Sequence, residues 1–153
     1  MHGEPGTGKT VYLKHLTSLL PEQRFIFFPR EYVKLIASPE FLEFAVERLG
    51  NSVLIMEDAE ELLLDRTEFQ NNIVPAILNI TDGMLSDLLN IKMICTFNCK
   101  EEHIDSALLR KGRLIAKHKF DKLCYEKAKI LAHTQNKQIP EGKPITLAEI
   151  YGD

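Results

Sequence analysis

The first residues of the chain combine glycines, a lysine and a hydroxyl group within one short segment. Gly3-Glu4-Pro5-Gly6-Thr7-Gly8-Lys9-Thr10 has the spacing G-x-x-x-x-G-K-[ST]. Glycines let successive backbone N–H groups converge on phosphate oxygens, and the N-terminus of a following helix favours the same negative charge. Lys9 adds a positive charge, and the Thr10 hydroxyl can bind Mg²⁺. The segment therefore predicts a nucleoside triphosphate site.

Two adjacent carboxylates follow an apolar run near the middle of the chain. The run is Ser52-Val53-Leu54-Ile55-Met56, and Glu57 and Asp58 come directly after it. A buried parallel strand would deliver these acids to the carboxyl edge of a sheet, where α/β folds bind ligands. One carboxylate could hold Mg²⁺, and the other could polarise the water that attacks a γ-phosphate. The alternative is a solvated acidic loop, because three more acids lie between positions 60 and 65.

Two further polar motifs follow in order along the chain. Asn98 ends the next apolar run, and its amide could hydrogen-bond the γ-phosphate or the attacking water without adding negative charge. Arg110 and Arg113 then flank Gly112. Planar guanidinium groups suit a transition state whose charge is spread over phosphate oxygens, here at a subunit boundary. On spacing alone, the less favoured alternative for the arginine segment is a basic surface turn.

In this order, the four motifs resemble the Walker A, Walker B, sensor-1 and arginine-finger motifs of the AAA+ ATPases. The resemblance covers nearly the whole chain, from Gly3 to about Thr134. The order Glu57-Asp58, together with the stretches 77–83 and 105–113, is similar to one subfamily. Its best-known member is the mitochondrial chaperone that translocates the Rieske iron–sulfur protein, and related bacterial and phage proteins fit equally well.

The resemblance implies ATP and Mg²⁺ as ligands and a role for each matching residue. The implied ATP-binding residues are Gly3, Glu4, Pro5, Gly6, Thr7, Gly8, Lys9, Thr10 and Val11. The implied metal ligands are Thr10 and Glu57, and the implied catalytic residues are Asp58, Glu57, Asn98, Arg110 and Arg113. Most members have Asp before Glu at the two acids, so the roles of this pair could be shared or swapped. Members form homo-oligomeric rings, usually hexamers but heptamers in the Rieske-protein chaperone. In these rings the arginines act in trans on a neighbour, and protein substrates are remodelled.

Alternating strand and helix patterns predict an α/β fold with a mainly parallel sheet. Strands are expected at 24–28, 52–56, 92–97 and 114–120, and helices at 11–20, 39–49, 73–80 and 123–134. The resemblance implies a three-layer α/β/α P-loop NTPase core over 1–120, with strand order 5-1-4-3-2, and a partial helical lid over 121–153. Only two residues precede the glycine-rich loop, so we expect its first strand to be missing. A missing inner strand would leave backbone groups unpaired, which favours a fragment over a chain in which something else fills that place.

Composition and charge limit the kinds of partner. The 153 residues are 44% apolar and 27% charged, as in an ordinary globular protein, and no apolar run is long enough for a membrane span. Three cysteines without metal spacing are typical of reduced thiols, so we expect a cytoplasmic location, with any membrane anchor upstream of this chain. Residues 1–109 carry 9 Lys/Arg and 17 Asp/Glu, whereas residues 110–137 carry 9 and 2. We interpret the basic segment as a surface that meets the acidic part of a neighbouring copy, although a solvated basic helix has the same pattern.

The interpretation that unites these observations is an ATPase motor in which hydrolysis drives the remodelling or translocation of a protein substrate. One alternative is an assembly switch, in which ATP orders the ring and little of it is hydrolysed. Another is a nucleic-acid-associated AAA+ protein, suggested by the basic segment. Nucleic acid is not otherwise indicated, because no aromatic residues are interleaved with the basic ones.

Overall fold

The computed structural model describes residues 1–62 and 72–152. Three parallel strands form the main sheet in the order β2-β3-β4: β2 (Arg24–Phe27), β3 (Ser52–Met56) and β4 (Lys92–Cys95). The connections between them carry helices, as parallel strands require. The helical elements of the described residues are α1 (Lys9–Leu19), η1 (Arg30–Ala37), α2 (Pro39–Arg48), η2 (Ala59–Leu62), α3 (Ile73–Thr81), α4 (Ser86–Leu89), η3 (Glu101–His103), α5 (Tyr125–Thr134) and α6 (Leu147–Tyr151), with η marking 3-10 helices.

A short strand in front of the glycine-rich loop joins this sheet to a fifth strand. β1 (His2–Gly3) pairs in parallel with β5 (Lys119–Phe120), and His2 also forms a bridge to Phe97, just beyond β4. The strand order is therefore β5-β1-β4-β3-β2, which confirms the predicted order and the α/β P-loop fold. The expectation that the first strand is missing is wrong, because two of its residues occupy the predicted inner position.

The fifth strand is much shorter than the sequence predicts. The apolar run at 114–120 indicates a strand throughout, but only Lys119–Phe120 is strand. The reason is the length of its neighbour, since β1 offers two residues to pair with. Residues 114–118 are not strand, although the His118 carbonyl accepts a hydrogen bond from the His2 N–H of β1 at 3.0 Å.

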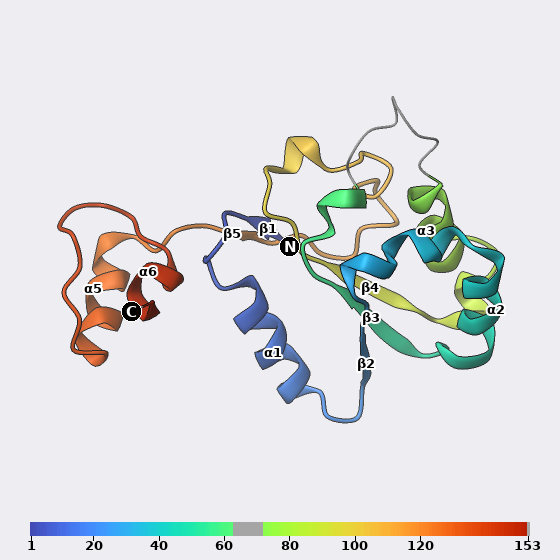
Figure 1. The fold of residues 1–153 in the computed structure, drawn as a ribbon, viewed down its shortest axis with the longest axis horizontal. Helices are drawn as coiled ribbons and strands as arrows, with labels where there is room; N and C mark the ends of the chain where they lie inside the picture. Colours follow the sequence, from blue (N-terminus) through green and yellow to red (C-terminus); the bar gives the residue numbers. More distant parts are fainter. Residues whose placement is uncertain (63–71, 153) are drawn as a thin grey trace.

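Side chains of β3 point alternately into two apolar layers, one on each face of the sheet. Leu54 and Met56 belong to the larger cluster, with residues of η1, α2 and α3. Val53 and Ile55 pack on the opposite face with Leu13 of α1. All five residues of β3 are buried, as expected of a parallel strand covered on both faces. Figure 1 shows the three layers, with α1 on one side of the sheet and α2 and α3 on the other.

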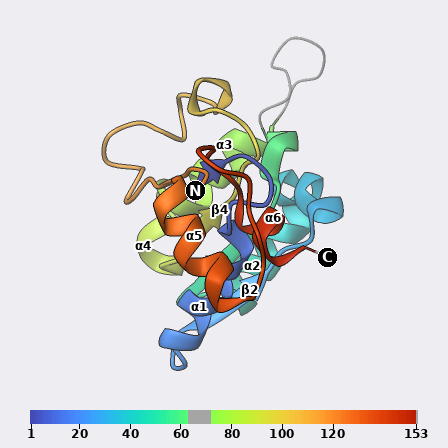
Figure 2. The same ribbon diagram turned by 90° about the vertical axis from the view of Figure 1, so that its left-hand side faces the viewer.

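The C-terminal helices have a small apolar cluster of their own. It consists of Ala128, Ala132, Ile145 and Ile150, from α5, α6 and the segment before α6. The helices lie beside the β1–β5 end of the sheet, well away from α2 and α3 (Figure 1). Seen from that end, α5 and α6 stand in front of the sheet (Figure 2). No helix within residues 1–62 and 72–152 has the length and apolarity that crossing a membrane requires.

Candidate nucleoside triphosphate site

The glycine-rich loop runs from β1 into α1 and depends on two of its glycines. Gly6 and Gly8 have φ angles of 75° and 102°, in the left-handed region that favours glycine. A Cβ atom at Gly6 would lie 2.7 Å from the Cβ of Ala148, and one at Gly8 would lie 2.5 Å from the Leu147 Cδ1. Both positions therefore need glycine for their backbone conformation, and Gly6 also needs it for the close approach of Ala148 in α6.

Lys9 lies under this loop and is almost fully buried, with 6% of its surface exposed. Its ammonium group donates hydrogen bonds to the carbonyl oxygens of Gly3 and Glu4, both at 2.8 Å. Burial lowers the pKa of Lys9, and the negative charges of Asp58 and Glu60 partly oppose that shift. The lysine charge therefore faces the acids that follow β3.

Thr10 and Glu57 meet at the C-terminal edge of β3. The Thr10 hydroxyl donates to Glu57 Oε1 at 2.5 Å, across 47 residues of sequence. Adjacent hydroxyl and carboxylate oxygens are hard donors that suit Mg²⁺, which usually takes few protein ligands and completes its shell with phosphate and water. Among the described residues, no group of three His, Cys, Asp or Glu side chains could hold a metal by itself. The pair therefore fits an ion that arrives with a phosphate ligand.

Asp58 and Asn98 form a second pair at the same edge. The Asn98 side-chain amide donates to Asp58 Oδ1 at 2.7 Å, and the Asp58 N–H donates to Thr96 Oγ1 at 3.0 Å. Asp58 has a φ angle of 50°, which is uncommon for a residue with a side chain. Such conformations persist where the surroundings fix them and are common at functional sites. The contact with Thr96 is one such constraint.

The loop, Asp58, Asn98 and α6 line one cavity of about 600 Å³. This volume is within the range of small-molecule sites. Its lining residues are Pro5, Gly6, Gly8, Lys9, Thr10, Val11, Asp58, Asn98, Leu147, Ala148 and Tyr151. A larger hollow of about 1050 Å³ shares Asn98 with it and is also lined by Glu4, but it contains neither Lys9 nor Asp58. We therefore take the smaller cavity as the phosphate site.

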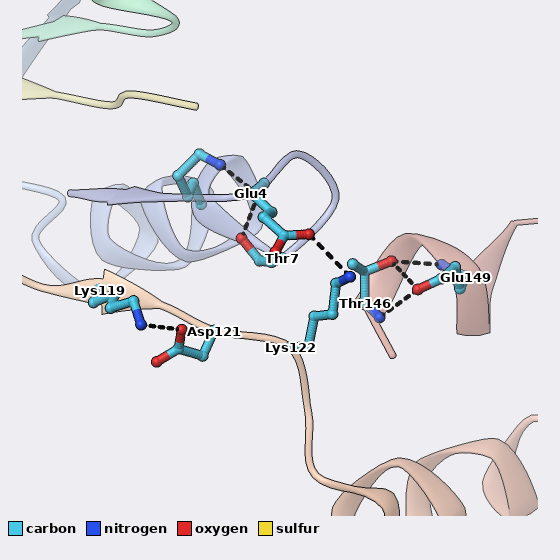
Figure 3. A network of polar contacts seen from close by, with 8 residues as sticks. Glu4, Thr7, Lys119, Asp121, Lys122, Thr146 and Glu149 are labelled. Carbon is cyan, nitrogen blue, oxygen red and sulfur yellow. Dashed lines mark hydrogen bonds and ion pairs between the residues drawn. The ribbon is translucent and has the colours of Figure 1, made fainter. Parts of the chain in front are cut away.

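The approach of α6 to this cavity was not foreseen from the sequence. The Ala148 N–H donates to the Gly6 carbonyl at 3.0 Å, and Lys122 forms an ion pair with Glu4 at 3.0 Å. Figure 3 shows the contacts around this junction, including the Thr7 hydroxyl that donates to the Glu4 carbonyl. Hydrogen bonding to Glu4 raises the pKa of Lys122. The helical segment is thus tied to the phosphate loop at several points.

α6 begins with a reciprocal cap. Thr146 accepts a hydrogen bond from the Glu149 N–H, and the Glu149 carboxylate accepts one from the Thr146 N–H. The motif Thr-x-x-Glu was the signal that could have located this helix start. Its position over the loop depends on the tertiary fold and could not be inferred from the motif.

The two arginines do not reach the cavity of their own chain. Arg113 Nε is 2.6 Å from Asp82 Oδ2, and its Nη1 donates to the Ala107 carbonyl at 3.3 Å. Arg110 is exposed. Neither side chain is among the residues that line the phosphate cavity. A role in this chain's own site is therefore not supported by the geometry.

Glu60 is a site residue that the sequence patterns missed. It belongs to the acids at 60–65, for which a solvated loop was the alternative interpretation. Asp65 of this group lies outside the described residues. Glu60 is half-buried, and its carboxylate accepts a hydrogen bond from the Asn98 N–H. The spacing of two residues after Asp58 was the available signal, but many surface acids share it.

Comparison with known proteins agrees with this geometry. A family model described as "ATPase family associated with various cellular activities (AAA)" matches residues 1–122. The chain is similar to an "AAA ATPase forming ring-shaped complexes" from Corynebacterium diphtheriae, with 29% identity over 169 residues that cover 95% of this chain and 33% of that protein. It is also similar to the Arabidopsis thaliana "AAA-ATPase At3g50940", with 27% identity over 124 residues that cover 74% of this chain and 27% of that protein. The chain spans about a third or less of the length of these relatives.

Proposed function

Because the chain belongs to the AAA ATPase family, we propose that its cavity binds ATP with Mg²⁺ and hydrolyses the γ-phosphate bond. The observation that carries this proposal is the convergence of three groups at one sheet edge. They are the Lys9 ammonium under the loop, the Thr10–Glu57 pair, and the Asp58–Asn98 pair.

Phosphate binding is assigned to the loop and Lys9. The ammonium group already donates to the Gly3 and Glu4 carbonyls, so it is held within the loop and needs little ordering when a phosphate enters. Burial strengthens its attraction to phosphate oxygens, because fewer water molecules screen the charge. Val11, Leu147 and Tyr151 extend the cavity beyond the phosphates and offer apolar surface for the nucleoside.

Thr10 and Glu57 are assigned to the metal. Bound Mg²⁺ would neutralise charge on the β- and γ-phosphates. The short contact between the two side chains supports Glu57, rather than Asp58, as the acid that shares the ion with Thr10. This favours Glu57 as the metal ligand and Asp58 as the general base over the reverse assignment.

Asp58 and Asn98 are assigned to the attacking water. The Asp58 carboxylate can accept a proton from that water, and the hydrogen bond from the Asn98 amide fixes the orientation of the carboxylate. The second Asn98 amide hydrogen can reach a phosphate oxygen or the water itself. Pre-aligned donors of this kind stabilise developing charge without further reorganisation.

The arginines are assigned to a neighbouring copy in a homo-oligomeric ring. A relative carries the name of a ring-forming ATPase, and the arginines of this chain do not line their own cavity. We propose that Arg110 and Arg113 act in trans, that a hexamer is the assembly, and that turnover is coupled to remodelling of a protein substrate. The resemblance to the subfamily of the Rieske-protein chaperone belongs to the same proposal, as does an intracellular location in which Cys95, Cys99 and Cys124 stay unpaired, as the structure has them.

Residues 1–120 are proposed as the nucleotide-binding core and residues 121–153 as a partial helical lid. The separate apolar cluster of α5 and α6 and the contact of Ala148 with Gly6 support this division.

Steady-state phosphate release by the full chain, before and after Asp58→Asn, tests the proposal. We expect the substitution to lower turnover by about 10²–10⁴-fold, because it removes the general base. ATP affinity should hardly change, since the asparagine keeps the shape of the side chain. Asp121→Asn is the matched control, because Asp121 is exposed and pairs with Lys119 outside the cavity. Equal turnover in the wild type and Asp58→Asn would refute the hydrolytic part.

A further inference from the structure

Glu60 links the segments that follow β3 and β4, next to the Asp58–Asn98 pair. It lies in the turn that follows β3, whereas Asn98 lies in the segment that follows β4. The contact links the Glu60 carboxylate to the Asn98 backbone N–H. A carboxylate acceptor makes this a charge-assisted hydrogen bond, which is stronger than one between neutral groups.

Two other contacts fasten the same pair of segments. The Asp58 N–H donates to Thr96 Oγ1 at 3.0 Å, and the Ala59 N–H donates to the Thr96 carbonyl at 2.9 Å. Together with the Glu60 contact, they attach residues 58, 59 and 60 in turn to residues 96 and 98. The Asn98 amide then donates to Asp58 Oδ1 at 2.7 Å and closes the ring of contacts.

The position of Asn98 depends on Glu60 more than on regular secondary structure. β4 ends at Cys95, so Asn98 lies three residues beyond the last strand residue. The Phe97 N–H donates to the Met1 carbonyl, and the Phe97 carbonyl accepts from the Gly3 N–H. For the Asn98 N–H, the acceptor found among the described residues is the Glu60 carboxylate. Loss of that acceptor would free the Asn98 backbone at the point where its side chain must be aimed.

The charge of Glu60 reaches the phosphate loop as well. Its negative charge and that of Asp58 both raise the pKa of the buried Lys9, against the lowering by desolvation. It also raises the pKa of the neighbouring Cys99, although burial is the larger cause there. Glu60 therefore lies near enough to the cavity to affect its charges, although it is not among the residues that line it.

We propose that Glu60 is a positioning residue, which holds the Asn98 backbone so that the Asn98 amide aligns Asp58 to accept a proton from the water that attacks the γ-phosphate. This inference rests on the hydrolytic function proposed above. Glu60 does not touch the reacting atoms in this account, and its effect passes through Asn98. The expected consequence is a loss of alignment rather than a loss of nucleotide binding.

Glu60→Ala and Glu60→Gln in the full chain test this role. The alanine variant lacks the acceptor, and we expect its kcat to fall by about 10–100-fold, as small misplacements of catalytic groups can cause. The glutamine variant keeps an acceptor oxygen and should recover most of that loss. The Kd for Mg-ATP should stay within about twofold in both. Glu102→Ala is the matched control, because Glu102 is exposed and pairs with Lys100.

Hydrogen exchange at the Asn98 amide, followed by NMR, gives a second readout that needs no turnover. We expect exchange to accelerate about tenfold or more in Glu60→Ala and to stay near the wild-type rate in Glu60→Gln and Glu102→Ala. Unchanged exchange at Asn98 in Glu60→Ala, or an unchanged kcat, would overturn the proposal. So would an equal loss of kcat in the alanine and glutamine variants. A wild-type chain that binds no Mg-ATP would overturn the proposed function itself, and that outcome is distinguished by the wild-type measurement alone.

Discussion

The sheet edge and the arginine segment differ in how complete they are within one chain. At the edge, Thr10 meets Glu57 and Asp58 meets Asn98, with hydrogen bonds of 2.5 and 2.7 Å. In the segment 105–113, Arg113 is paired with Asp82, and Arg110 is exposed and does not line the phosphate cavity. The first region is organised by the fold of a single chain. The second carries arginines that suit a phosphate transition state, but they lie outside the phosphate cavity of their own chain.

The difference indicates how the proposed chemistry is divided. Groups that bind phosphate and metal need hydrogen bonds that are set before the ligand enters, and the ends of adjacent parallel strands supply them. Charge that develops only in the transition state can be met by a group from outside. A site completed from outside would hydrolyse ATP only when copies are assembled, which links turnover to assembly.

Arg110→Ala should produce the largest effect on turnover and the smallest on binding. Removal of an arginine that acts in trans lowers kcat by about 10³-fold or more, because the transition-state charge is no longer met. Phosphate release by the assembled protein and ATP calorimetry on the same sample would measure both quantities. Lys111→Ala, the exposed neighbour, is the control.

Mixed assemblies sharpen the same comparison. Asp58→Asn subunits keep their arginines, and Arg110→Ala subunits keep their sheet edge. A mixture of the two inactive variants should therefore regain part of the wild-type turnover. If Arg110→Ala instead weakened ATP binding by the isolated chain and mixing restored nothing, the contrast between the two regions would fail.

Lys9→Ala should weaken Mg-ATP binding by about 100-fold. The substitution removes a charge-assisted contact to phosphate in a buried site, worth a few kcal/mol. Fluorescence titration with a labelled nucleotide would report the change. Lys14→Ala is the control, because Lys14 lies exposed on the same helix and outside the cavity. An unchanged Kd for Mg-ATP in Lys9→Ala would contradict the assignment of phosphate binding to Lys9 and the loop.

Asp82→Asn should have a modest effect that stays within the arginine segment. The ion pair with Arg113 is partly exposed, with 28% and 37% of the two side chains accessible, so its contribution to the free energy of unfolding is about 0.5 kcal/mol. Denaturant unfolding would measure that change, and nucleotide affinity should be unaffected. A loss of ATP binding would show that the two regions are coupled within one chain.

Acid should loosen the α6 cap with only a local effect. Backbone and side-chain hydrogen bonds from Thr146 lower the pKa of Glu149 below its ordinary value of 4.5. The folded form therefore holds the proton less tightly than the unfolded one. The stabilisation is complete above pH 4.5 and is lost as the pH falls through the lower folded pKa. NMR shifts of the Thr146 and Glu149 amides should follow that titration and stay flat in Glu149→Gln.

The sequence predicted the parts of the fold that depend on local pattern. The run at 52–56 became β3 with the same bounds. The strand order, which was implied by the family resemblance and not by local pattern, is also confirmed. The run at 114–120 failed because strand length also depends on the neighbour, and β1 is only two residues long. The hydrophobic pattern of a segment indicates which residues can be buried. How many of them form a strand also depends on how many residues the neighbouring strand offers for pairing.

The site was predictable where motif spacing fixes position. The loop and the acids after β3 lie together as their order along the chain suggested. Glu60 and α6 were missed for different reasons. Glu60 looks like any surface acid until its contact with Asn98 is seen, and Ala148 reaches Gly6 across 142 residues through tertiary packing. Neither contact has a local pattern in the sequence.

Calorimetry of ATP binding with and without Mg²⁺, on the wild type and Glu57→Gln, tests most directly whether the loop and the acids serve one ligand. We predict that Mg²⁺ raises the affinity of the wild type for ATP by about tenfold or more and that Glu57→Gln loses most of this gain while still binding free ATP. If ATP produced no binding heat in magnesium buffer, or if Glu57→Gln gained as much affinity from Mg²⁺ as the wild type, the account would be contradicted.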